Sequence, residues 1–279
     1  MGSELRQDYF GNPVLLAKNR KFRPKHFIRK DKIAKKVCPF CPGNEGLTPP
    51  ETDRFEVGGN WVFRSFPNKF PFVPAGEVHE VIAETRKHDK RLSDFSLDEM
   101  VELFHFYQRR INRVKGYAYL LKNEGSTAGA SIPHAHSQLV TLPKKPKIIS
   151  VEKRVLNFKE IKKSEKKYVI SEDKHFFSYC PRASKYPLEA WIVCKRESSN
   201  LKDLSVGELK SVSKQLLFIM KKLDGKLKKP AFNLFHHDSG PNYHIHVIPR
   251  ISVLAGMEMG LNAFVNSVPP EEAVRFYKK

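Results

Sequence analysis

Two stretches of this sequence repeat one pattern at a spacing of about 110 residues. The first begins at Leu92 and the second at Leu201, and both read Leu-x-Asp-(Phe/Leu)-Ser-(Leu/Val)-x-Glu. In each, a Ser precedes an amphipathic run and a Glu follows it three residues later, which is the capping-box signature of a helix N-terminus. We therefore expect helices over about 92–114 and 201–223.

Strand-like segments flank both predicted helices at the same spacing. An apolar segment precedes each helix, over 79–85 and 189–195, and a His-x-His motif follows each, at 134–136 and 244–246. Three features in register indicate two copies of one unit. Strands before and after a single helix favour an antiparallel sheet with the helix on one face, which is an α+β fold.

The boundary between the copies falls in a stretch rich in Lys and Arg, between Pro143 and Tyr168. We place the two units at 1–145 and 146–279. Part of the stretch between them, Val151–Ile161, is expected to form a surface helix.

The chain has 50 Lys and Arg and 30 Asp and Glu, which gives a net charge of +20. This charge first suggests an anionic partner such as nucleic acid. The basic residues are mostly Lys and are spread over several stretches, which favours a solvated Lys-rich surface. A hydrophobic content of 40% excludes a disordered chain. No apolar run reaches the roughly 18 residues of a membrane span, and residues 1–12 lack a signal-peptide pattern, so a cytoplasmic protein is expected.

A Cys-x-x-Cys at Cys38 and Cys41 favours half of a zinc site, because no helix pattern follows it as redox chemistry would need. Neither cysteine has a counterpart 110 residues later, and His88 has none either. A structural zinc ion takes four N or S ligands in a tetrahedron. The two cysteines, His88 and one His of the 134–136 motif would complete such a set.

The segment around that first His-x-His is the sharpest chemical motif. In a strand, His134, His136 and Gln138 would face the same side. Gly125 and Gly129 lie just upstream, where a backbone can approach a phosphate closely. Two imidazoles and an amide beside such a loop suit phosphoryl or nucleotidyl transfer, with one His attacking phosphorus and the amide donating to a phosphoryl oxygen.

With these motifs, the sequence resembles the galactose-1-phosphate uridylyltransferase branch of the histidine-triad superfamily over nearly its whole length, and tandem units are the architecture of that family. The motifs that carry the resemblance, in chain order, are Arg20-Lys-Phe-Arg-Pro24, Cys38-Pro-Phe-Cys-Pro-Gly-Asn-Glu45, Arg64-Ser-Phe-Pro-Asn-Lys-Phe70, Lys122-Asn-Glu-Gly125, Ser131-Ile-Pro-His-Ala-His-Ser-Gln138, Tyr243-His-Ile-His-Val-Ile-Pro-Arg250, and Gly256-Met-Glu-Met259 with Pro269-Pro-Glu-Glu-Ala273.

The resemblance implies a role for each matching residue. It makes His136 the nucleophile that takes up a nucleoside monophosphate, and it assigns the zinc site to Cys38, Cys41, His88 and His134. It also implies substrate contacts. Gln138 and Ser131 would bind the transferring phosphoryl group, with Asn123 and Gly129 nearby, and Phe66 and Asn68 would bind the nucleotide. Arg20 and Arg23 would contact phosphates across a homodimer interface, and Glu258 would contact sugar hydroxyls.

The resemblance also implies a second metal site, for zinc or iron, made of one Glu and three His. Here these would be Glu152, His236, His244 and His246. The alternative is that His244 and His246 are relics of the duplication, kept as packed polar residues of a strand.

The activity implied is a ping-pong transfer of UMP between hexose 1-phosphates through a covalent nucleotidyl-histidine. The expected partners are a nucleotide-sugar and a hexose 1-phosphate, and no membrane partner is expected. Gln138 stands where the hydrolases of the superfamily carry another His, which favours transfer to phosphate over hydrolysis. Ser252, Val253 and Lys69 depart from the family pattern at sugar and base contacts. These departures motivate an alternative, a nucleotide-sugar or dinucleotide phosphorylase that uses inorganic phosphate. The charge motivates a second alternative, a nucleic-acid-binding histidine-triad protein.

Overall fold

The computed structural model describes residues 4–7, 13–16, 37–238 and 240–279, and its α+β fold confirms the predicted class. Most strands form one antiparallel sheet of ten, and β1 and β2 form a separate pair. The strands are β1 (Glu4–Gln7), β2 (Pro13–Leu16), β3 (Asp53–Val57), β4 (Asn60–Pro67), β5 (His79–Ala83), β6 (Tyr117–Glu124), β7 (His136–Leu142), β8 (Val169–Glu172), β9 (Phe176–Tyr179), β10 (Ala190–Cys194), β11 (Phe232–His237) and β12 (His244–Pro249). The α-helices are α1 (Leu97–Ile111), α2 (Lys147–Val155), α3 (Phe158–Ser164), α4 (Val206–Leu227), α5 (Gly256–Leu261) and α6 (Pro270–Lys278).

The strand order of the large sheet shows the repeat. It runs β3-β4-β5-β7-β6 and then β11-β12-β10-β9-β8, so the second half repeats the first in reverse across the β6–β11 pair. At this join, Asn123 of β6 lies opposite Asn233 of β11, and the Asn233 amide donates to Asn123 Oδ1 at 2.7 Å. The two halves therefore share one sheet, and the boundary between the units 1–145 and 146–279 stays a prediction.

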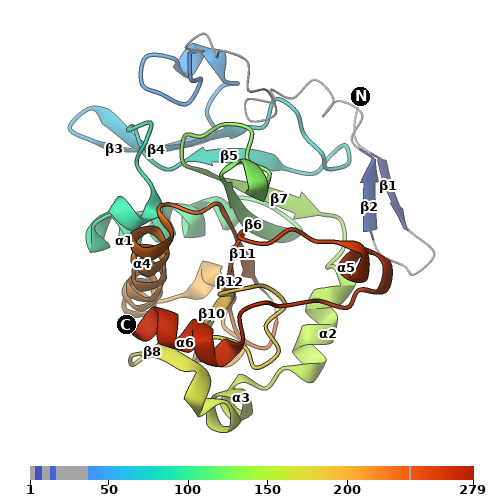
Figure 1. Ribbon diagram of the computed structural model, residues 1–279. Coiled ribbons are helices and arrows are strands. Elements are labelled where there is room, and N and C mark those ends of the chain that lie inside the picture. Colours follow the sequence, from blue (N-terminus) through green and yellow to red (C-terminus); the bar gives the residue numbers. More distant parts are fainter. Residues whose placement is uncertain (1–3, 8–12, 17–36, 239) are drawn as a thin grey trace.

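The two long helices lie together on one face of the sheet, while α2 lies on the other (Figure 1). Both begin directly after the predicted N-cap Ser, at Leu97 and Val206, and the first residues of the expected ranges form short 3₁₀ turns instead. Ser96 and Ser205 accept from the backbone N–H of Glu99 and Glu208, and each Glu side chain returns the bond to the N-cap backbone. The buried side chains under α1 and α4 belong to one continuous core that spans both halves.

The linker forms two helices instead of the single predicted one. The break comes at Leu156 and Asn157, because the Asn157 side chain accepts from the backbone N–H of Glu160 at 3.2 Å and so caps a new helix, α3. The buried Glu152 of α2 faces the sheet.

Among the described residues, no helix has the length and apolar character needed to cross a membrane.

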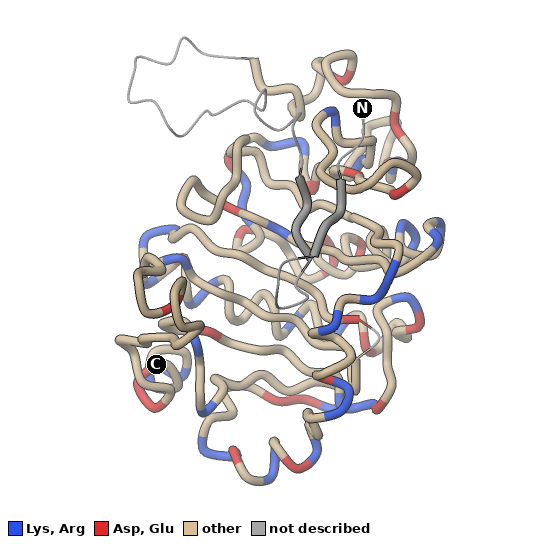
Figure 2. Tube along the Cα trace, turned by 90° about the vertical axis from the view of Figure 1, so that its right-hand side faces the viewer, with Lys and Arg blue, Asp and Glu red and all other residues tan. Residues whose placement is uncertain are grey.

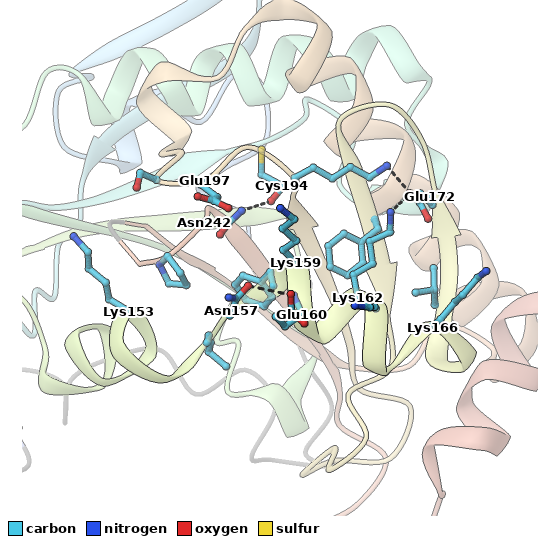
Figure 3. A pocket seen from close by; sticks show the side chains of 18 of the residues that line it. Lys153, Asn157, Lys159, Glu160, Lys162, Lys166, Glu172, Cys194, Glu197 and Asn242 are labelled. Atoms are coloured by element: carbon cyan, nitrogen blue, oxygen red, sulfur yellow. Dashed lines mark hydrogen bonds and ion pairs between the residues drawn. The ribbon is translucent and has the colours of Figure 1, made fainter.

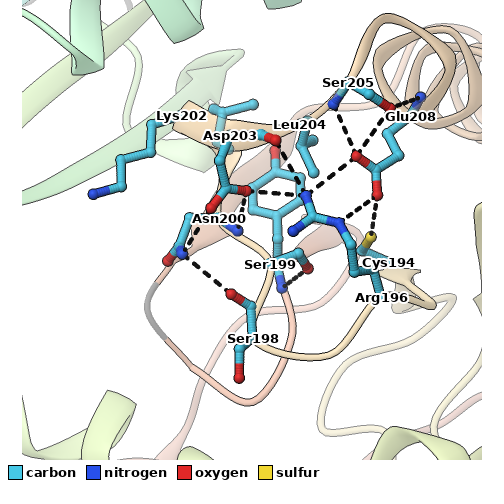
Figure 4. A network of polar contacts seen from close by, with 12 residues as sticks. Cys194, Arg196, Ser198, Ser199, Asn200, Lys202, Asp203, Leu204, Ser205 and Glu208 are labelled. Atoms are coloured by element: carbon cyan, nitrogen blue, oxygen red, sulfur yellow. Dashed lines mark hydrogen bonds and ion pairs between the residues drawn. The ribbon is translucent and has the colours of Figure 1, made fainter.

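A network of polar side chains surrounds the N-terminus of α4 (Figure 4). The Arg196 guanidinium donates to Glu208 at 2.7 Å and to the Asp203 carboxylate at 3.0 Å, and Ser205 completes the capping box. Burial would raise the pKa of Glu208, but these donors outweigh it and lower the pKa to about 2. Glu208 therefore stabilises the fold in its ionised form.

Replacement of this carboxylate tests the network. Glu208→Gln should lower the free energy of unfolding at pH 7 by about 2 kcal/mol, since the folded pKa lies below the unfolded one. The difference from wild type should be full above pH 4.5 and shrink as the pH falls toward 2. Urea denaturation from pH 7 to pH 3 measures it. Glu102→Gln, an exposed change on α1, is the control, and a pH-independent difference would contradict the assignment.

Candidate functional site

The strand β7 carries the predicted motif and presents it to a small cavity of about 260 Å³. Side chains alternate along a strand, so His136 and Gln138 face the cavity and Ser137 faces the helices. The cavity is closed by residues of β4, β5 and the loops before β3 and β7. Its lining is Pro39, Phe40, Leu47, Thr48, Pro49, Phe66, Asn68, Lys69, Phe70, Val81, Ser131, Ile132, His136 and Gln138.

His136 is held as a neutral imidazole. Its Nδ1 donates to the carbonyl oxygen of His134 at 2.8 Å, which leaves the lone pair on Nε2. Burial and the positive charge of Lys122 lower the pKa of His136 to about 4. The ring of Phe40 packs edge-on against it, with centroids 5.2 Å apart. A buried imidazole with one fixed tautomer is the form that can act as a nucleophile at neutral pH.

Gln138 is oriented by a residue that we did not predict, His79. The backbone N–H of Phe72 donates to His79 Nδ1 at 3.3 Å, and His79 Nε2 lies 2.9 Å from Gln138 Oε1 and 3.0 Å from Asn68 Nδ2. The amide oxygen of Gln138 therefore faces His79, and its NH₂ group is the end that is left to donate to a bound group.

The four residues predicted for zinc come together beside this cavity. The Nδ1 of His134 lies 3.8 Å from Cys38 Sγ and 3.5 Å from Cys41 Sγ, and His88 Nδ1 lies 3.4 Å from Cys41 Sγ. Ligands at tetrahedral angles around zinc lie about 3.6 Å apart. His134 Nε2 donates to the carbonyl oxygen of Thr85 at 2.6 Å, which leaves Nδ1 free to bind a metal. The donor set and its spacing therefore fit a tetrahedral metal ion.

A second cluster lies in the other half of the sheet, and it corrects one predicted member. Glu152, His244 and His246 meet as expected, but the third His is His237. Because neighbours on a strand face opposite sides, His236 points to the helices, where its Nδ1 contacts the Tyr243 hydroxyl at 2.5 Å.

The chemistry of this second cluster also fits a metal ion. His237 Nδ1 lies 2.8 Å from Glu152 Oε2, and His244 Nε2 lies 3.7 Å from the same oxygen. The Nε2 atoms of His244 and His246 are buried and have no hydrogen-bond partner among the residues that the structure describes. Two orphaned imidazole nitrogens beside a buried carboxylate are the donors that zinc or iron takes.

The structure does not bring every predicted contact to the cavity. Arg20 and Arg23 lie outside the described residues. Of the others, Asn123 bonds Asn233, Gly129 ends a short turn with φ of 86°, and Glu258 caps its own helix by accepting from the Ala255 backbone N–H at 2.8 Å. These three are not part of the cavity lining.

A larger cavity, of about 1540 Å³, lies away from His136, between the linker helices and the outer strands of the second half. Eight Lys or Arg and three Glu line it, and Figure 3 shows Lys153, Lys159, Lys162 and Lys166 around it. Figure 2 shows that basic residues are also spread over many other segments. The charge is therefore a general property of the surface, as the sequence suggested.

Sequence reasoning missed three residues of these sites, and a signal existed for each. Phe40 lies inside the Cys-x-x-Cys motif. His79 stands 110 residues before Glu189, so comparison of the copies marks it as specific to the first half. His237 neighbours the predicted His236, and only the register of β11 separates the two.

Known proteins match this chain over its length. A family model described as the N-terminal domain of DUF4931, a domain of unknown function, matches residues 20–145. ADP-glucose phosphorylase of Arabidopsis thaliana is 28% identical, with 99% of this chain and 92% of that protein covered. Galactose-1-phosphate uridylyltransferase of Thermotoga maritima is 27% identical, with 87% and 89% covered. The crystal structure of the Arabidopsis thaliana phosphorylase with bound ADP-glucose has a TM-score of 0.79 at 27% identity, with 99% of both chains covered.

The predicted resemblance is confirmed: an ADP-glucose phosphorylase and a galactose-1-phosphate uridylyltransferase are homologues of this chain over most of its length.

Proposed function

We propose that this protein is a nucleotidyltransferase that cleaves a nucleotide-sugar through a covalent nucleotidyl-His136. The observation that carries the proposal is the state of His136. It is a buried, neutral imidazole with its Nδ1 proton engaged and its Nε2 lone pair available, and it lines a cavity. Gln138 and Ser131 in the same lining supply donors for phosphoryl oxygens, and Phe66 and Asn68 supply an apolar and a polar contact for the nucleotide.

The acceptor that we favour is inorganic phosphate, so that the overall reaction is that of an ADP-glucose phosphorylase. One support is the extent of similarity to the Arabidopsis thaliana enzyme of that name. Another is the departure from the family pattern at Ser252 and at Val253, which is 87% exposed. The uridylyltransferase reading remains the second candidate, because the Thermotoga maritima relative has nearly the same identity to this chain.

The reaction proceeds in two displacements. His136 Nε2 attacks the α-phosphorus, a nitrogen–phosphorus bond forms, and the bond to the sugar 1-phosphate breaks. Phosphate then attacks the same phosphorus, the nitrogen–phosphorus bond breaks, and a nucleoside diphosphate leaves. The sugar 1-phosphate leaves as an anion, phosphate attacks as an anion, and His136 leaves as a neutral imidazole, so neither step needs a strong general acid or base. The Gln138 amide donates to the phosphoryl oxygens as charge builds on them.

The substrate contacts supplied by parts of the chain away from the cavity are also part of the proposal. We place Arg20 and Arg23 at substrate phosphates across a homodimer interface, Asn123 and Gly129 near the transferring group, and Glu258 at the sugar. A dimer would bring a second chain's residues to the substrate, since Glu258 of this chain is outside the lining of its own cavity.

The covalent step is tested with nucleotide-sugars labelled at the α-phosphate. The denatured wild-type chain should carry label, and His136→Gln should lose both the label and turnover, the latter by roughly 10³-fold or more. His105→Gln changes a half-buried His of α1 outside the site and should behave like wild type. An unlabelled wild-type chain with every nucleotide-sugar would contradict the proposal.

A second assay separates the two candidate acceptors. Protein given ADP-glucose and phosphate should release glucose 1-phosphate and ADP, with kcat/KM at least about tenfold above that for UDP-glucose with galactose 1-phosphate. A chromatographic assay of both product pairs measures this ratio. The reverse preference would establish the uridylyltransferase reading.

For the metals, we propose zinc at Cys38, Cys41, His88 and His134, and zinc or iron at Glu152, His237, His244 and His246. A zinc ion at the first set would bind the His134 end of β7 and so fix the strand that carries His136. Neither metal needs to touch the substrate.

Metal analysis of the purified chain tests both sites at once. The wild type should hold about two metal ions per chain, and Cys41→Ser and His246→Gln should each lose one. Each variant is the control for the other, because the clusters lie in different halves. Loss of the first metal should also lower the melting temperature and the activity. A wild type with less than about one metal ion per chain would rule out the four-ligand site.

A further inference from the structure

A buried ionic network lies directly behind the nucleophile, on the helix side of the sheet. Lys122 of β6 and Glu84 next to β5 are 1% and 0% exposed, and their charged groups are 2.7 Å apart. Lys122 Nζ also lies 3.1 Å from Glu124, which pairs with Arg91 at 2.7 Å. Charges buried this deeply are rare in proteins unless they are paired.

Both members of the central pair bond the part of β7 that carries His136. Lys122 Nζ donates to the carbonyl oxygen of His136 at 3.3 Å. The Glu84 carboxylate accepts from the hydroxyl of Ser137 and from that of Tyr107 on α1. The backbone N–H of Glu84 donates to the carbonyl oxygen of Ala135 at 3.1 Å. Lys122 and the Glu84 carboxylate therefore hold His136 and Ser137 from the face opposite to the cavity, and the Glu84 backbone holds Ala135 within the sheet.

We propose that Lys122 and Glu84 are positioning residues for nucleotidyl transfer, which hold His136 at the distance and angle that attack on phosphorus requires. The inference rests on the proposed function, because the position of His136 matters only if it is the nucleophile. Rates of transfer are sensitive to position, and a displacement of about 1 Å at the reacting atom can cost about 10²-fold.

A purely structural role makes a different prediction. Another buried ion pair joins Arg110 of α1 to Glu80 of β5, with Nη2 and Oε1 2.7 Å apart. It lies on the same side of the sheet, and within the described part of the chain no hydrogen bond or ion pair links it to His136. If the Lys122–Glu84 pair served the fold alone, neutral replacement of either pair would have the same effect on catalysis.

The experiment compares two double variants of the full chain, Lys122→Met/Glu84→Gln and Arg110→Met/Glu80→Gln. Each removes both charges together, so neither leaves an unpaired buried charge that would prevent folding. The measurements are kcat and KM with ADP-glucose and phosphate, and amide hydrogen exchange at Ala135–Gln138. We expect kcat of the first variant to fall about 10²-fold with KM within threefold of wild type, and we expect kcat of the second to change less than threefold.

Either of two kinetic results would overturn the inference: a kcat of the first variant within twofold of wild type, or equal losses in the two variants. A wild type that labels at His136 shows that the proposed function holds whatever these variants do. If the wild type transfers nothing, the proposed function fails and the positioning role fails with it. In an active wild type, faster exchange at Ala135–Gln138 in the first variant alone supports the positioning role, and unchanged exchange refutes it.

Discussion

The site depends on the alternation of side chains along β7, with contributions from both faces of the strand. On one face, His136 and Gln138 line the cavity; on the other, Ser137 bonds the buried carboxylate of Glu84. Just before the strand, His134 joins the cysteines. A shift of register by one residue would exchange the two faces and destroy all three arrangements together. The metal cluster and the ionic network therefore act on the same strand, from its end and from behind.

The two halves share a fold but differ where a substrate would lie. The residue opposite His136 on β5 is Ala83, and the residue opposite His246 on β10 is Trp191. Side chains of paired residues lie on the same face. The small Ala83 leaves room beside His136, whereas the indole of Trp191 lies over His246 with ring centroids 3.9 Å apart. The second half thus replaces an open cavity with packing around a buried cluster of His and Glu.

Much of this arrangement could be predicted because it follows local rules. The capping boxes at Ser96 and Ser205 fixed where both long helices begin, and the repeat indicated the order of strands. The cluster of Cys38, Cys41, His88 and His134 could be predicted because its cysteines have no counterparts in the second copy. The choice between His236 and His237 could not, because it depends on the pairing of β11 with β12, which only the tertiary fold sets. The contact between Lys122 and Glu84 could not be predicted either, because residues 38 positions apart carry no local signal that they meet.

The join of β6 with β11 has a consequence for how such a chain can change. Each half covers the hydrogen-bonding edge of the other, and Arg91 of the first half bonds Asp224 of α4 at 2.7 Å across the join. A half expressed alone would expose a long strand edge, which invites aggregation. The second half therefore supports the first by pairing with β6, although the cavity at His136 lies in the first half. A fused duplicate of this kind is free to specialise one half but not to delete the other.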